Sequence, residues 1–148
     1  LAHDKDEVVG MIAIDSPDAT VLVVSEKGYG KRTDIDDYRV TNRGGKGVKT
    51  INVTEKTGAL VAIKNVTDAD DLMIINKSGI VIRIVVAELR VMGRATQGVR
   101  LITLKGNDEI ASVAKIEHEE EEELTEGDET TTDQTEENNN EENQDKTE

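Results

Sequence analysis

The apolar and polar positions of this chain follow a pattern that repeats after 51 residues. Residues 25–53 align without a gap on residues 76–104, and glycines and cations keep the same register as the apolar residues. In each copy a run of β-branched and apolar residues, at 20–25 and 72–76, predicts a buried strand. A period near 50 residues is typical of stacked supersecondary units such as propeller blades.

Each unit is predicted to contain four strands, the number found in a propeller blade. An apolar strand opens the unit, the buried strand follows, a turn with glycine makes a hairpin, and a short strand ends near Arg32 or Arg83. One helical turn and a last strand complete the unit. In the first and second units, the residues assigned to these elements are 8–14 and 60–66 for the opening strand, 26–28 and 76–79 for the turn, 34–38 and 85–89 for the helical turn, and 48–53 and 99–104 for the last strand.

A third copy of the opening strand, at 110–116, follows the second unit. It either completes the edge of the preceding blade or closes a ring, because an exposed sheet edge invites unwanted pairing. We therefore predict an all-β fold, a propeller-like array of four-stranded blades with units at about 8–58 and 60–107. The chain enters directly into repeat material, and we expect it to be the carboxy-terminal fragment of a longer protein.

The composition changes at residue 117. Residues 117–148 contain 16 Asp and Glu, one Lys and a single strongly apolar residue, Leu124. Such a segment cannot bury enough apolar surface to offset the entropy of ordering it, so we predict a disordered acidic tail after a folded body at 1–116. The net charge of −14 comes from that tail, since residues 1–116 hold 17 Lys and Arg against 16 Asp and Glu. Two roles stay open for this tail: a passive solubilising appendage, or a tethered polyanion that competes with any anionic ligand of the body.

Several classes of site are excluded or disfavoured by composition. The chain has no cysteine, which rules out disulfides and thiolate metal sites and is compatible with a reducing compartment. No apolar run approaches the roughly 18 residues of a membrane-spanning helix. The two histidines, His3 and His118, are far apart in the sequence, and the Asp-rich turns lack the spacing of a calcium loop. No metal site is predicted.

Candidate chemistry is concentrated in cations at equivalent positions of the two units. Around residues 38–49 they flank glycines, which permit positive φ and close approach of the backbone to a neighbour. A repeated fold explains repeated apolar positions, whereas repeated arginines indicate a repeated anionic ligand. The residues predicted to contact that ligand are Lys31, Arg39, Arg43, Lys46, Lys49, Arg90, Arg94 and Arg100, with the loop glycines Gly44, Gly45, Gly47 and Gly98.

Other readings of these cations stay open. Each arginine taken singly is as well explained by a solvated face or a salt bridge, and Arg32 and Arg83 are expected to have internal partners because they end strands. Nucleotide binding is disfavoured, since the glycine-rich loop lacks the G-x-x-x-x-G-K-[ST] order and leads into a strand. With no Phe or Trp to stack on single-stranded bases, duplex DNA is the better ligand.

The run Asn-Arg-Gly-Gly-Lys-Gly at 42–47 resembles the glutamine-led box in the carboxy-terminal domain of the A subunit of DNA gyrase. Residues 28–33 and 92–99 are similar to later repeats of the same domain, and the similarity covers about 7–116. That family's domain is a β-pinwheel, a ring of propeller-like blades whose basic rim wraps DNA. The resemblance implies the last two blades of a pinwheel followed by the tail. Thr41 and Asn42 stand where the family's box begins with Gln, so the decisive wrapping role is not assigned to this loop.

The resemblance also implies a function and partners. It implies a DNA-binding and DNA-wrapping module that supports ATP-dependent negative supercoiling by a cytoplasmic type II topoisomerase. The partners would be double-stranded DNA, the rest of the gyrase A subunit, and the gyrase B subunit, with no membrane. ATP and magnesium would be held by the B subunit, whereas this chain would hold no cofactor. Tyr29 and Tyr38 match nothing catalytic in the family, so no catalytic residue is predicted.

Two alternatives to that function stay open. One is a module from the A-type chain of topoisomerase IV, which selects substrates rather than wrapping them. The other is a propeller-like protein-interaction module whose basic loops bind an acidic partner and which has no role with DNA.

Overall fold

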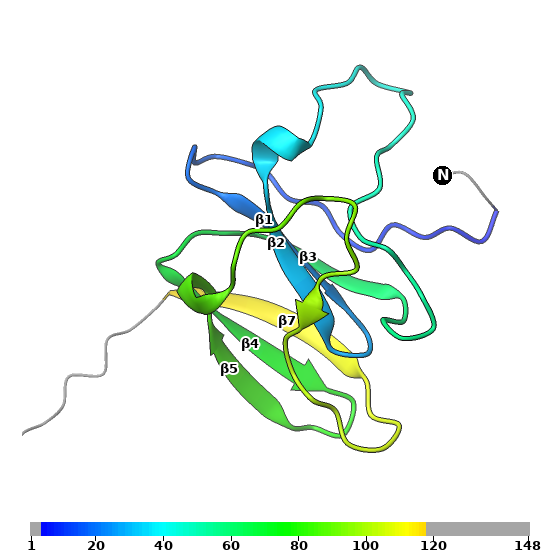
Figure 1. Cartoon of the computed structure of the whole chain (residues 1–148), viewed down its shortest axis with the longest axis vertical. Coiled ribbons are helices and arrows are strands. Elements are labelled where there is room, and N and C mark those ends of the chain that lie inside the picture. The colour runs from blue at the N-terminus through cyan, green and yellow to red at the C-terminus, as the bar shows by residue number, and fades with distance from the viewer. Residues whose placement is uncertain (1–3, 118–148) are drawn as a thin grey trace, which may run out of the picture.

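The computed structural model describes residues 4–117, which form two antiparallel sheets that share a core (Figure 1). The first sheet contains, in spatial order, β3 (Leu60–Val66), β1 (Thr20–Ser25), β2 (Tyr29–Asp34) and β6 (Val99–Arg100). The second contains β5 (Val81–Val85), β4 (Asp70–Asn76) and β7 (Ile110–Glu117). The all-β prediction is confirmed. Residue 117, predicted to begin the acidic tail, ends β7, and residues 118–148 lie outside the described residues.

The central strand of each sheet is the predicted β-branched run. Every residue of β1 is buried, because this strand has packed side chains on both faces. The corresponding strand β4 is less covered: Leu72 and Ile74 are buried, whereas Met73 is half-buried and Ile75 is exposed. One face of the second sheet is therefore more open than either face of the first.

The predicted hairpins and helical turns are present. Gly28 and Gly79 end the β1–β2 and β4–β5 turns with φ of 85° and 87°, a conformation that L side chains rarely adopt. Their N–H groups donate to the carbonyls of Ser25 (3.1 Å) and Asn76 (3.0 Å). The helical turns are the 3-10 turns η1 (Ile35–Asp37) and η2 (Val86–Glu88). The repeated glycine is thus explained by the backbone geometry of the turn.

The strands that were expected to open units pair differently. β3, expected to open the second unit, lies antiparallel to β1 in the first sheet, and β7 lies antiparallel to β4 in the second. The first alternative for 110–116, completion of the preceding blade, is therefore the observed one. A repeat pattern fixes the spacing of strands but not whether a strand pairs with the unit before it or after it. The sheets accordingly do not coincide with units at 8–58 and 60–107.

Two predicted strands are wrong, and a third is shorter than predicted. Residues 8–14 and 48–53 form no strand, and only Val99–Arg100 of 99–104 does. That short strand, β6, pairs with β2 of the other sheet rather than within its own unit. The equivalent partner for 48–53 would be the short strand of an earlier unit, which the described residues do not contain. Residues 8–14 lie against the first sheet instead, where the carbonyl of Ala13 accepts a hydrogen bond from Asn65 Nδ2 (3.1 Å).

The second unit completes the first sheet through a segment that follows β2 along its length. The N–H of Met92 donates to the carbonyl of Arg32 and that of Leu101 to the carbonyl of Gly28, both at 2.8 Å. Between them the chain approaches so closely that a Cβ on Gly98 would lie 2.4 Å from the carbonyl oxygen of Gly30. In Figure 1 the chain between η2 and β6 passes from the second sheet across to the first. Residues 91–102 are called the exchange segment below.

Two apolar clusters hold this arrangement together. The larger cluster joins Leu22 and Val24 of the first sheet to residues of the second sheet and of the exchange segment, including Ile102. The smaller one covers the other face of β1, where Val21 and Val23 pack with Ile51. Burial of apolar surface between the sheets therefore fixes the two units to each other. No helix within residues 4–117 is long and apolar enough to cross a membrane.

Candidate nucleic-acid interface

Arg32 and Arg83 have internal partners, as expected. The Arg32 side chain is 5% exposed and its Nη1 donates to Asp68 (2.7 Å) and to the carbonyls of Val86 (3.0 Å) and Leu89 (3.2 Å). Arg83 donates from Nε to Asp71 (2.5 Å), and its side chain is 39% exposed. Neither arginine belongs to the candidate interface.

Lys31 was predicted to contact the ligand, and its position in the structure corrects that. It is 1% exposed, and its Nζ donates to the carbonyls of Gly93 (2.7 Å) and Arg94 and to Thr96 Oγ1 (3.2 Å). Burial, helped by the nearby charge of Arg94, lowers the pKa of Lys31 below its ordinary value. Its ammonium holds the exchange segment in place. The sequence signal for this role is Ile82, the apolar residue at the equivalent position of the second unit.

The glycine-rich loop presents four of the predicted cations. Residues 38–50 connect η1 to the buried Ile51 and extend away from the first sheet at the top of Figure 1. Within the described residues, none of the four cations forms an ion pair, and Arg39 Nη2 donates to the carbonyl of Lys46 at 3.3 Å. All four are exposed: Arg39, Arg43, Lys46 and Lys49. These four residues are called the basic loop below.

Arg94 connects the second unit to the basic loop. Its Nε donates to the carbonyl of Asp37 (3.1 Å) and its Nη1 to the carbonyl of Lys49 (2.8 Å). The neighbouring Asn52 N–H donates to the carbonyl of Thr96 at 3.1 Å. Arg94 is half-buried, and two of its N–H groups bind backbone carbonyls of the first unit. Its guanidinium therefore helps to position the two units relative to each other.

The arginines of the second unit lie along β2 rather than on unrelated surfaces. The exchange segment starts beside Arg32, which bridges to Val91, and ends beside Tyr29, which pairs with Arg100. Because a strand rises about 3.3 Å per residue, those two points on β2 are about 10 Å apart. Arg90 and Arg100 are both exposed, with Arg94 between them in sequence. The backbone therefore brings Arg94 and Arg100 close to β2, and Arg94 also contacts the chain at both ends of the basic loop.

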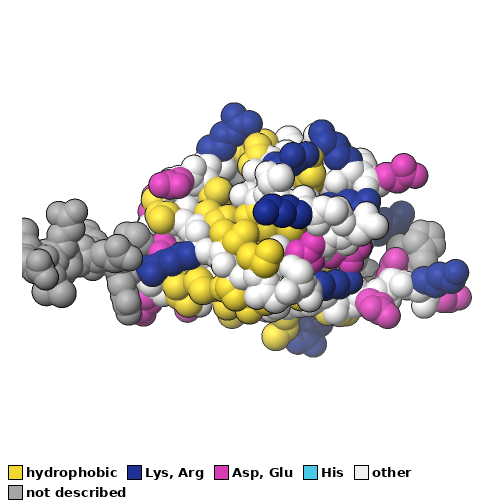
Figure 2. All heavy atoms as spheres, turned by 90° about the horizontal axis from the view of Figure 1, so that it is seen from below, with side chains coloured by type: hydrophobic (Ala, Val, Ile, Leu, Met, Phe, Trp, Pro, Cys, Tyr) yellow, Lys and Arg dark blue, Asp and Glu magenta, His cyan; other side chains and the backbone are white. Residues whose placement is uncertain are grey.

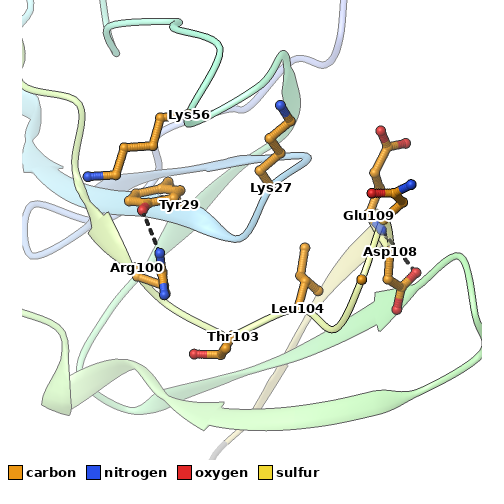
Figure 3. A pocket seen from close by; sticks show the side chains of 10 residues that line it. Lys27, Tyr29, Lys56, Arg100, Thr103, Leu104, Asp108 and Glu109 are labelled. Carbon is orange, nitrogen blue, oxygen red and sulfur yellow. Dashed lines mark hydrogen bonds between the residues drawn. The ribbon is translucent and has the colours of Figure 1, made fainter.

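A cavity of about 510 Å³ lies at the Arg100 end of this row (Figure 3). Arg100 Nη2 donates to the hydroxyl of Tyr29 at 3.0 Å, and the Arg100 guanidinium and the Lys56 Nζ each lie 5.5 Å from the centre of the Tyr29 ring. The hydrogen bond from Arg100, together with the charges of Arg100 and Lys56, lowers the pKa of Tyr29 against the opposing effect of burial. Lys27 lines the same wall. We call Lys27, Tyr29, Lys56 and Arg100 the Tyr29 pocket.

The carboxylates across the cavity already have partners. Asp108 accepts hydrogen bonds from the backbone N–H (3.1 Å) and hydroxyl (2.6 Å) of Ser78, and Glu109 forms an ion pair with Lys77. Within the described residues, Lys56 and Arg100 form no ion pair. Lys56 and Arg100 thus line the cavity without an ion-pair partner, opposite a wall that carries the carboxylates of Asp108 and Glu109.

The repeat pattern gave no indication of Lys27, Tyr29 or Lys56. Their counterparts in the second unit are Ser78, Ile80 and Asn107, all neutral, so a search for repeated cations passes over them. Figure 2 shows Lys and Arg side chains spread over the face seen from below, beside a contiguous apolar patch.

The four predicted loop glycines have different structural roles. Gly98 is required by the close approach to Gly30, and Gly44 has φ of 75° in the basic loop. A Cβ added to Gly47 would meet no atom within 4 Å. A Cβ added to Gly45 would contact only Thr41 and Asn42 of the same loop. Within residues 4–117 no group of three or more His, Asp or Glu is placed to hold a metal ion.

Comparison with known families identifies the fold. Residues 19–67 and 70–117 each match the family described as DNA gyrase C-terminal domain, beta-propeller. The chain belongs to this family. The two matched segments contain the strands of the first and second sheets, with β6 of the second segment inserted into the first sheet. The resemblance read from the sequence is confirmed, and the structure is part of a gyrase A-type carboxy-terminal pinwheel.

Sequence similarity to DNA gyrase A subunits supports that assignment. The chain is 48% identical over 120 residues to the A subunit of DNA gyrase from Staphylococcus aureus, both in strain NCTC 8325 and in strain MRSA252. The match covers 80% of this chain and 14% of the relatives, so the chain spans about a seventh of their length.

Two solved structures share the fold. A DNA gyrase A C-terminal domain superposes with a TM-score of 0.60 at 29% identity, covering 65% of this chain and 33% of that one. The C-terminal domain of DNA topoisomerase IV superposes with a TM-score of 0.64, covering 70% of this chain and 32% of that one. Its identity of 20% shows the fold alone.

Proposed function

We propose that this chain is a DNA-binding and DNA-wrapping module of a gyrase A subunit. The observation that carries the proposal is a group of exposed cations that form no ion pair within residues 4–117. The arginines of the exchange segment and the Tyr29 pocket lie beside β2, and Arg94 connects them to the basic loop, which extends away from the first sheet. The body of the chain holds nearly as many acids as bases, so leaving this group unpaired is a feature of the fold.

The ligand that fits is the phosphate backbone of a duplex. Arg and Lys contacts to phosphates give affinity without reading sequence, and that affinity falls as salt rises. Within the Tyr29 pocket one phosphate oxygen would be met by Arg100 and Lys56, with the Tyr29 hydroxyl beside them. Bending 20–30 base pairs by 40–90° costs on the order of 1–6 kcal/mol. Two blades offer few contacts to offset that cost, and wrapping would need the basic rim of a full ring.

In the parent enzyme this module would support ATP-dependent negative supercoiling. Its partners would be the rest of the gyrase A subunit, and the gyrase B subunit, which would hold ATP and magnesium. A module of topoisomerase IV type is the second candidate, and the 48% identity to gyrase A subunits favours gyrase. The third is a protein-interaction module, which the same exposed cations would serve by binding an acidic partner.

The test is the salt dependence of binding to a duplex of random sequence. The triple variant R39Q/R43Q/K46Q removes three exposed cations whose side chains carry no part of the core. Each phosphate contact contributes about 0.9 to the slope of log K against log salt, so the variant is expected to lower that slope by about 2.7.

The matched control is K5Q/K64Q/K115Q, which removes the same charge from the amino-terminal segment, β3 and β7, at the cost of a 4.0 Å ion pair between Lys115 and Asp70. Its slope is expected to equal that of the wild type. If the slope fell equally in both triple variants, the loss would reflect net charge rather than the proposed interface. If DNA binding by the wild type did not depend on salt, the protein-interaction module would be favoured.

A further inference from the structure

The segment that carries the basic loop, residues 38–50, has few bonds of its own. It contains no strand and no helix, and every residue from 39 to 47 is exposed (Figure 1). Inside it, the N–H of Gly45 donates to the carbonyl of Asn42 at 3.2 Å, and Arg39 Nη2 donates to the carbonyl of Lys46 at 3.3 Å. A loop of this kind keeps a defined shape only if its ends are held.

The two ends of this segment are joined at its base. The hydroxyls of Tyr38 and Thr50 are hydrogen-bonded at 2.5 Å, which closes the segment from within the first unit. Arg94 of the second unit closes it again, because Nε donates to the carbonyl of Asp37 and Nη1 to the carbonyl of Lys49. One guanidinium thus links the residue before the segment to the last cation of the basic loop.

The backbone around Arg94 is itself fixed to the first unit. Lys31 is 1% exposed, and its Nζ donates to the carbonyls of Arg94 and of Gly93, the latter at 2.7 Å. On the other side, Asn52 Nδ2 donates to the carbonyl of Ala95 at 3.1 Å. The Arg94 side chain therefore starts from a position that the surrounding residues define, as a residue that orients a binding site requires.

We propose that Arg94 is the positioning residue of the basic loop, and that it acts on DNA through that loop rather than by contacting phosphate. This role rests on the proposed DNA-binding function. A phosphate contact needs donors that face solvent, whereas Arg94 is half-buried and directs two N–H groups at backbone carbonyls. Arg90 and Arg100, its neighbours in the group of candidate cations, are exposed.

Holding the ends of the loop matters for binding because ordering a loop costs entropy. A loop whose base is already fixed loses less freedom when its four cations are brought onto one duplex. Without the Arg94 contacts the same charges would occupy many positions, and fewer of them would lie near a phosphate at one time. The effect is therefore one of arrangement, at unchanged net charge.

Arg94→Lys separates positioning from direct contact, because it keeps the charge. An ammonium has no donor equivalent to Nε, so the bond to Asp37 is lost and the link between Asp37 and Lys49 is broken. In the full chain without DNA, NMR relaxation of the backbone amides is expected to show order parameters at 39–47 falling below about 0.6, the range of flexible backbone, from a higher value in the wild type. Unchanged order parameters overturn the proposal, whatever the variant does with DNA.

The matched control is Arg83→Lys. It makes the same exchange of side chain and also removes an Nε contact, to Asp71, but Arg83 lies outside the candidate interface. Its order parameters at 39–47 and its affinity for DNA are expected to equal those of the wild type. If the loop loosened equally in both variants, the cause would be general destabilisation, and the assignment to Arg94 would be wrong.

Binding to a duplex of random sequence tests the effect on DNA. Each phosphate contact contributes about 0.9 to the slope of log K against log salt, so a loosened loop that loses about one to three contacts lowers the slope of Arg94→Lys by about 0.9–2.7. A lysine that merely replaced a direct arginine contact would leave the slope unchanged. An unchanged slope in a wild-type background that binds DNA would therefore contradict the positioning role alone.

A double-mutant cycle shows how Arg94 acts. In R39Q/R43Q/K46Q/K49Q the basic loop has no charge left to position, so adding Arg94→Gln is expected to leave the slope unchanged. A further fall of about 0.9 would show that Arg94 contacts phosphate itself and would overturn the proposal. A wild type that does not bind the duplex would contradict the proposed function as well, which distinguishes the two failures.

Discussion

The two units share one sequence pattern, yet within residues 4–117 only the first has a four-stranded sheet. β2 is covered on its outer edge by a segment of the following unit, and both faces of β1 are packed. β5 has an open edge, and Ile75 on one face of β4 is exposed. The sheet of one unit is therefore completed by a strand of the following unit, as β6 completes the sheet that contains β2. Equivalent residues therefore differ in burial and partners although the sequence around them is the same.

The largest expected loss of stability is at Arg32, and its counterpart Arg83 provides the comparison. Arg32→Met would leave Thr20, Val86 and Leu89 without their buried donor, at a cost of about 3 kcal/mol of unfolding free energy. Arg83→Met removes one charge-assisted hydrogen bond, to the buried carboxylate of Asp71, and is expected to cost about 2 kcal/mol. Urea unfolding of the two variants measures both values. Equal losses would mean that the following unit adds nothing to the environment of Arg32.

The next largest expected loss of stability is at Gly98, and its counterpart Gly47 provides the comparison. Gly98→Ala forces an L side chain into φ of 77° and against the Gly30 carbonyl, and the backbone strain alone costs about 1–3 kcal/mol. Gly47→Ala meets open space and is expected to change stability by less than about 0.5 kcal/mol. Thermal unfolding of both variants at a concentration where the chain is monomeric provides the comparison. A Gly47 variant that loses as much stability as the Gly98 variant would show that the two segments are docked alike.

Much of the fold could be predicted because the repeat pattern carries local information. The β-branched runs, the glycines with positive φ at 28 and 79, and the short helical turns all follow from residues close in sequence. The pairing of β3 and β6 could not be predicted, since a strand that recurs every 51 residues fits the unit before it and the unit after it equally well. Only the completed packing distinguishes the two.

Candidate-site residues could be predicted where they recur in both units, but not where their partners are distant in sequence. The exposed cations of the basic loop stand out because they recur, and Arg32 and Arg83 were separated from them by their place at strand ends. Lys31 was misassigned because its partners, the carbonyls of 93 and 94, come from a segment more than 60 residues away. Three of the four residues of the Tyr29 pocket were missed because Lys27, Tyr29 and Lys56 have no charged counterpart in the second unit, whereas Arg100 was predicted.

The most direct measurement is backbone amide exchange with and without a saturating duplex. Exchange is expected to slow in residues 38–50 and 90–100, where the basic loop and the exchange segment carry the candidate phosphate contacts, and to stay unchanged in β7. Slowing in β7 or β3 with none in those two segments would contradict the proposed interface.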